Sequence, residues 1–75
     1  MSPLRLRVER ARLEITQREL AEELGIPQSR ISRAENGATR LSREESERAQ
    51  HYFARKYLER QRSKQTAVEG GTPHA

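Results

Sequence analysis

The segment that most constrains the fold of this chain covers residues 17–36 and reads QRELAEELGIPQSRISRAEN. Ala21 is a small residue, Gly25 follows four residues later, and Ile31 follows six residues after the glycine. Two helices that cross at a steep angle need a small residue where their backbones approach, a glycine in the tight turn, and an aliphatic residue to seat the second helix. The spacing predicts a helix-turn-helix, although an ordinary helical hairpin in a small bundle is the alternative.

Signals for helix ends divide the chain into four predicted helices. Thr16 and Glu19 have the spacing of a capping box, in which each side chain pairs with a free backbone N–H at the start of a helix, and Ser42 and Glu45 repeat that spacing. Gly25 marks a helix end, because glycine enters the left-handed backbone region without a steric penalty. The helices are expected at residues 3–14, 16–24, 27–35 and 42 to about 62.

The composition favours one small helical domain. The chain has 75 residues and no cysteine, so packing between helices must hold it together without disulfide bonds. His51 and His74 lack partners at zinc-binding spacing, and no metal site is predicted. We therefore expect an all-α fold, a small helical bundle with a long C-terminal helix, over residues 1–62. Residues 63–75 are polar and are predicted to form a disordered tail.

The charge distribution points to a polyanionic partner. The net charge is +4, and residues 26–43 contain four arginines and one glutamate, whereas residues 16–25 contain one arginine and three glutamates. This asymmetry would give the domain a positive side, although an ordinary solvated surface is the alternative. No apolar stretch is long enough to span a bilayer and the N-terminus lacks a signal-peptide core, which predicts a cytoplasmic protein with no membrane partner.

Residues 5–43 resemble the repressor and Cro proteins of lambdoid phages and the wider group of xenobiotic-response-element (XRE) regulators. The resemblance is carried by TQRELAEELG at residues 16–25, by Ile31, and by the ENG run at residues 35–37. It implies a lambda-repressor-like domain that binds double-stranded DNA and needs no cofactor. The residues themselves argue against an enzyme, because the chain has no cysteine and its histidines lie outside the motif.

The resemblance also implies roles for individual residues. Gln17 would hold a DNA phosphate at the start of the second helix, where backbone N–H groups point outward. Arg10 and Glu35 would form a buried ion pair that ties the first helix to the third. Further phosphate contacts are implied at Asn36, Arg40 and Arg43, and Arg30 is grouped with them because a helical wheel allows it to lean toward the phosphates.

Base reading is assigned to the exposed face of the third helix. Glutamine can pair with adenine and arginine with guanine, each through two hydrogen bonds. The predicted base-reading residues are Gln28, Ser29, Ser32 and Arg33.

The chain departs from the family pattern at several places. Pro27 replaces the usual serine or threonine cap of the recognition helix, and Glu14 stands at a position that is often glycine. After residue 43, Ser46 and Ala49 stand where larger apolar residues are expected, and no fifth helix is evident.

The last helix is predicted to supply a dimer surface from its large apolar residues. Exposed on a monomer, they would form an apolar patch that a second copy could cover, which would place two recognition helices about 34 Å apart. The alternative is that Tyr52 and Phe53 complete the core of a single chain. The predicted dimer residues are Tyr52, Phe53, Tyr57 and Leu58.

These observations predict a homodimeric repressor that reads an inverted repeat in double-stranded operator DNA. The alternative is an antitoxin or another protein-interaction module, whose C-terminal helix binds a partner protein such as a toxin or an antirepressor.

Overall fold

The computed structural model describes the backbone of residues 1–71 and the side chains of residues 1–62. Residues 72–75, and the side chains of residues 63–71, lie outside the described part. The last helix, expected to end near residue 62, continues to Gly71, so the backbone at 63–71 is helical and the predicted disordered tail stays a prediction only for residues 72–75. The described backbone contains helices and no strands, which confirms the predicted all-α class and the long C-terminal helix. The elements are α1 (Pro3–Arg12), α2 (Gln17–Leu24), α3 (Gln28–Glu35) and α4 (Arg43–Gly71).

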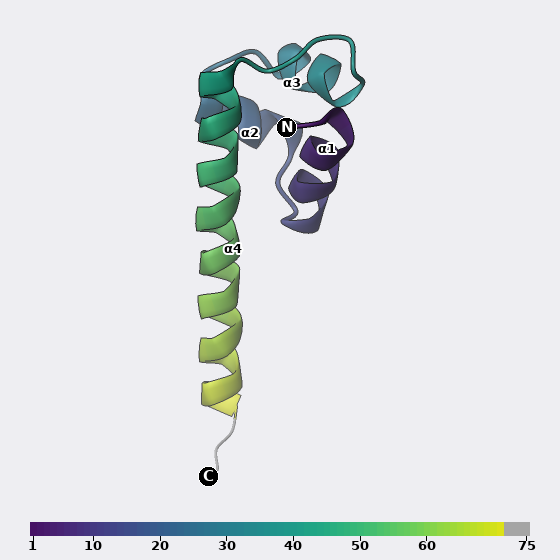
Figure 1. Cartoon of the computed structure of the whole chain (residues 1–75). Helices are drawn as coiled ribbons and strands as arrows, with labels where there is room; N and C mark the ends of the chain where they lie inside the picture. The colour runs from purple at the N-terminus through teal and green to yellow at the C-terminus, as the bar shows by residue number, and fades with distance from the viewer. Residues whose placement is uncertain (72–75) are drawn as a thin grey trace.

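The first three helices lie around the N-terminal half of α4. Figure 1 shows a loop that leads from α3 to the start of α4 beside α2, after which α4 runs away from α3 and extends well beyond the other helices. α2 packs against both α3 and α4, and α1 packs against α3. The rest of α4 therefore projects from the side of the domain opposite α3.

The capping boxes and the glycine turn lie where the sequence predicts them, whereas α1 ends at Arg12, earlier than the predicted residue 14. The Glu19 N–H donates to Thr16 Oγ1 at 3.0 Å and the Thr16 N–H donates to Glu19 Oε1 at 3.2 Å, so the first capping box is complete. Gly25 ends α2 with a φ of +71°. Pro27 begins α3 without a side-chain cap, and the second capping box joins Ser42 to Glu45 at the start of α4.

The core is built from one face of each helix. Leu20 of α2 and Ile31 of α3 are completely buried, and Ala21 is buried where α2 and α3 pack together. The small side chain of Ala49 is also completely buried, which lets α4 lie close against α2. The buried apolar residues are Leu6, Ile15, Leu20, Ala21, Leu24, Ile31, Ala34, Ala49, Tyr52 and Phe53.

The structure corrects part of the predicted dimer surface. Tyr52 and Phe53 are only 7% and 5% exposed, because they follow Ala49 on the face of α4 that packs into the core. The alternative that these two aromatic residues complete the core of a single chain therefore holds. Tyr57 and Leu58 remain 50% and 63% exposed.

One residue adopts a backbone conformation that its side chain disfavours. Glu14, in the loop between α1 and α2, has a φ of +58°, in the left-handed region that favours glycine. Its carboxylate lies 3.4 Å from Arg60 Nη1 on α4. The departure from glycine at position 14 thus falls at a backbone conformation that favours glycine.

Candidate DNA interface

The third helix has two chemically different faces. Ile31 and Ala34 are buried against the rest of the domain, and Glu35 is buried beside them. Ser29 and Arg33 are exposed on the opposite side, Gln28 is exposed at the first position of the helix, and Ser32 is half-buried. None of the four residues predicted to read bases is buried in the core, and three of them are exposed to solvent.

Two exposed arginines, one on α3 and one in the loop that follows it, have no carboxylate partner among the described side chains. Arg33 and Arg40 are both exposed, and neither forms an ion pair with any side chain of residues 1–62. The loop after α3 folds back on the helix, since the Ala38 N–H donates to the Arg33 carbonyl oxygen at 2.9 Å. A guanidinium without a carboxylate partner is available to a phosphate or a base edge.

The other predicted phosphate contacts in this region are also exposed. Asn36 lies at the end of α3 with an exposed side chain, and Arg43 is the first residue of α4. Arg43 Nε lies 3.7 Å from Glu47 Oε2, in a pair whose side chains are 94% and 63% exposed. Such an exposed pair contributes little to stability, so it opens easily when a phosphate approaches.

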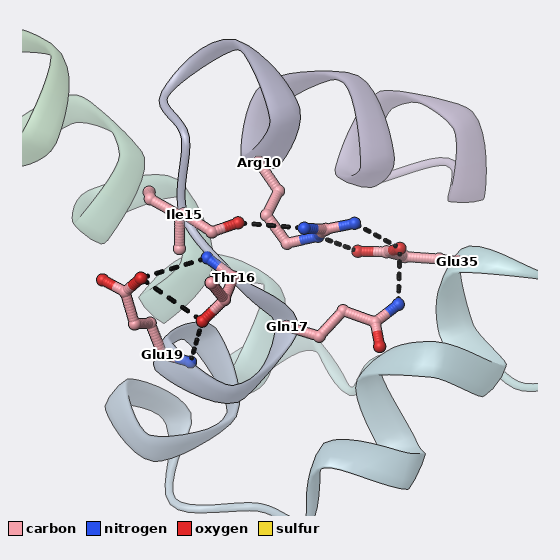
Figure 2. A network of polar contacts seen from close by, with 6 residues as sticks. All are labelled: Arg10, Ile15, Thr16, Gln17, Glu19 and Glu35. Atoms are coloured by element: carbon pink, nitrogen blue, oxygen red, sulfur yellow. Dashed lines mark hydrogen bonds and ion pairs between the residues drawn. The ribbon is translucent and has the colours of Figure 1, made fainter.

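A buried polar network holds α3 against the N-terminal part of the chain. Figure 2 shows Arg10 of α1 reaching Glu35, with Nε donating to Oε2 at 2.6 Å and Nη2 donating to Oε1 at 3.1 Å. Arg10 Nη1 also donates to the Ile15 carbonyl oxygen at 2.9 Å. The Glu35 side chain is 4% exposed and that of Arg10 19%. The ion pair that the resemblance implies is therefore present and nearly enclosed.

Gln17 joins this network instead of extending freely into solvent. Its Nε2 donates to Glu35 Oε1 at 3.0 Å, as Figure 2 shows. Gln17 is still the first residue of α2, and its side chain is half-buried. The same side chain therefore lies both in the structural network and at the helix start where a phosphate contact is predicted.

The sequence interpretation missed an ion pair between α3 and α4. Arg30, which was grouped with the phosphate contacts, donates from Nη2 to Glu45 Oε1 at 2.9 Å. Two sequence features are consistent with this contact: Arg30 lies at the edge of the exposed face of α3, and Glu45 belongs to a capping box. The sequence does not predict that the loop between α3 and α4 brings Arg30 and Glu45 together.

Other classes of site find no support in this part of the chain. Residues 1–62 contain no group of three or more side chains suited to hold a metal ion. No described helix is both long enough and apolar enough to cross a membrane.

Comparison with known proteins agrees with this arrangement. The family model HTH_3, described as helix-turn-helix, matches residues 6–59. This range includes most of α1, all of α2 and α3, and the part of α4 that packs on them. No curated protein and no solved structure was found to match the chain. Because the family model covers more than half of the chain, the protein belongs to the HTH_3 helix-turn-helix family of the Cro and XRE type, whose members bind DNA and are not enzymes.

Proposed function

We propose that this DNA-binding protein is a sequence-specific transcriptional repressor that acts as a homodimer and reads an inverted repeat with α3. The observation that carries the proposal is the outer face of α3, where polar side chains are exposed on a helix that Ile31 and Ala34 seat firmly in the core. An exposed recognition helix of this kind enters the major groove. Bound at a promoter, the dimer would block the polymerase without any cofactor.

The proposed base contacts follow from the chemistry of the outer face. Arg33 would hold a guanine through two hydrogen bonds, and Gln28 would hold an adenine in the same way. Ser29 and Ser32 would make single hydrogen bonds to neighbouring bases or phosphates. The absence of a carboxylate partner for Arg33 among the described side chains supports its assignment.

Phosphate contacts would flank these bases on both sides. Gln17 would add its amide to the N–H groups at the start of α2, and Asn36 would act at the end of α3. Arg40 and Arg43 would neutralise phosphates from the loop and from the start of α4. Both arginines are exposed, Arg40 in the loop that follows α3 and Arg43 as the first residue of α4.

The proposed dimer contact is smaller than the sequence suggested. Tyr57 and Leu58 are the exposed large apolar residues of α4 within the described side chains. Tyr57 also lines a groove of about 660 Å³ between α1 and α4, together with Met1 and Phe53. A second copy that covers these residues would hide apolar surface and place the two recognition helices about one DNA turn apart.

Selection of bound sites from random duplexes tests the proposal. We expect a shared motif made of two inverted half-sites whose centres lie about 10 base pairs apart, or a multiple of that spacing. A single half-site would contradict the dimer but not the sequence-specific binding. No shared motif at all would contradict the assigned role of α3.

A second candidate function is that of a protein-interaction module, such as an antitoxin. It is favoured by the direction of α4, which runs away from α3, and by the exposed Leu58 on this helix. The substitution Leu58→Ser separates the two candidates in the full-length chain. A homodimeric repressor should lose operator affinity, whereas an antitoxin-like protein should keep it and lose its partner protein.

A further inference from the structure

The outer side of α3 contains two arginines in different electrostatic states. Arg30 and Arg33 lie one helical turn apart and line the same cavity of about 300 Å³, together with Pro27, Ser29 and Thr39. Arg33 has no carboxylate partner in the described part of the chain, whereas Arg30 is paired with Glu45. Only one of the two positive charges in this cavity is therefore available to a ligand.

Glu45 is held in place from two directions. Its Oε1 accepts the Arg30 Nη2 at 2.9 Å and the Ser42 N–H at 2.8 Å. The Glu45 side chain is only 16% exposed, and that of Arg30 is 38% exposed. Because Glu45 also caps α4, turning away from Arg30 would break its hydrogen bond with the Ser42 N–H as well.

We propose that Glu45 withholds the Arg30 guanidinium from DNA phosphates and so lowers the sequence-independent part of the affinity for DNA. The inference rests on the proposed function. Each cation that neutralises a phosphate raises the affinity for every sequence alike. An arginine that must first leave a mostly buried carboxylate gains little from doing so.

The pair between Arg43 and Glu47 shows why Glu45 is distinctive. In that pair both side chains are largely exposed and the two atoms are 3.7 Å apart, so water and salt weaken the attraction. The Arg30 pair is shorter and less exposed, and it joins two different helices. The fold thus leaves Arg43 free to exchange its carboxylate for a phosphate and keeps Arg30 out of that exchange.

A reduced sequence-independent affinity has a direct consequence for recognition. A DNA-binding protein finds its site in competition with a large excess of other sequences, so the ratio of specific to non-specific affinity decides occupancy. The pair of Glu45 with Arg30 lowers the non-specific affinity, while Gln28 and Arg33 supply the specific affinity. We infer that Glu45 is a specificity-determining residue although it does not face the bases.

The substitution Glu45→Gln tests the proposal in the full-length chain. Glutamine also serves in a capping box, so the start of α4 is retained while the negative charge is removed. Glu44→Gln is the matched control, because it removes the same charge from the neighbouring exposed position. The measured quantity is the affinity for a random-sequence duplex as a function of salt concentration.

We expect Glu45→Gln to raise this affinity roughly fivefold at about 0.1 M salt and to steepen the logarithmic salt dependence by about 0.9, the value for one added phosphate contact. Glu44→Gln should leave the slope unchanged. Arg30→Ala should also leave the slope unchanged. The double variant with Arg30→Ala and Glu45→Gln should show neither the higher affinity nor the steeper slope of Glu45→Gln.

Two results overturn the proposal. One is a slope for Glu45→Gln that equals the slope of Glu44→Gln, and the other is an Arg30→Ala slope that is lower than wild type by about 0.9. The Arg30→Ala measurement decides the matter even where Glu45→Gln fails to fold. A wild-type chain without salt-dependent duplex binding overturns the proposed function as well, whereas a wild-type chain that selects a motif confines the failure to Glu45.

Discussion

The inward and outward faces of α3 differ in how completely their polar groups are partnered. On the inward face, Glu35 accepts hydrogen bonds from Arg10 and Gln17 and is nearly enclosed. On the outward face, Gln28 and Arg33 form no side-chain hydrogen bond or ion pair with the described residues. A single short helix therefore separates the groups that stabilise the fold from those available to DNA, and substitutions on the two faces should have separable effects.

The largest expected effect is on the inward face, at Glu35. The substitution Glu35→Ala leaves the Arg10 guanidinium in a mostly buried position with only the Ile15 carbonyl oxygen as a partner. Breaking a buried pair from one side costs about 3–5 kcal/mol of unfolding free energy. Because a domain of this size has little stability to spare, urea denaturation should show a strongly destabilised or unfolded protein.

The paired control separates charge from packing. Replacing both partners, as in Arg10→Met with Glu35→Met, removes both charges and should recover much of the stability. If Glu35→Ala alone unfolds at the wild-type urea concentration, the network does not stabilise the fold and the two faces of α3 do not differ as described.

On the outward face, Arg33→Ala should change DNA recognition and leave stability within about 0.5 kcal/mol of wild type. We expect a loss of about 1–3 kcal/mol of discrimination at one base pair of the selected site. Arg40→Ala is the matched comparison, because it should weaken binding to every sequence and flatten the logarithmic salt dependence by about 0.9. If both variants lost the same affinity on every DNA sequence, Arg33 would not read a base.

The sequence predicts the helix-turn-helix better than it predicts α4. The reason is that the signals of the helix-turn-helix lie within a few residues of each other in the chain, whereas the orientation of α4 depends on contacts with a distant helix. The cap at Thr16 and the turn at Gly25 depend on residues within a few positions, so their spacing is sufficient. Which aromatic residues of α4 face inward depends on how that helix is rotated where it packs against α2, and spacing alone allowed either answer. The predicted exposure of Phe53 was wrong for this reason.

The polar contacts of α3 also join residues that lie far apart in the chain, so local sequence patterns do not predict them. The pair of Arg10 with Glu35 came only from the resemblance to a family, because the two residues lie far apart in the chain. The pair of Arg30 with Glu45 was not predicted at all, since it depends on the path of the loop between α3 and α4. Contacts between distant helices are thus the part of this fold that local patterns leave open.

A smaller effect is expected from the inward face of α4, at Tyr52. Burial raises the pKa of the Tyr52 hydroxyl above its ordinary value of 10.0. The unfolded chain therefore loses this proton at a lower pH than the folded chain, so the free energy of unfolding falls as pH rises through about 10. Tyr52→Phe should show a smaller fall between about pH 9 and about pH 11, measured by urea denaturation, and an equal fall would contradict the assignment.

The smallest expected effect lies in the loop before α2, at Glu14. A non-glycine residue in the left-handed region costs about 1–2 kcal/mol of folding free energy, which glycine avoids. Glycine also loses more conformational freedom on folding, and this cost cancels about half of the gain. Glu14→Gly should therefore raise the melting temperature by about 3–5 °C. Glu14→Gln is the control, because it removes the charge facing Arg60 and keeps the unfavourable backbone conformation. Should the glycine variant melt no higher than the glutamine variant, which also lacks the ion pair with Arg60, backbone strain at this position does not limit stability.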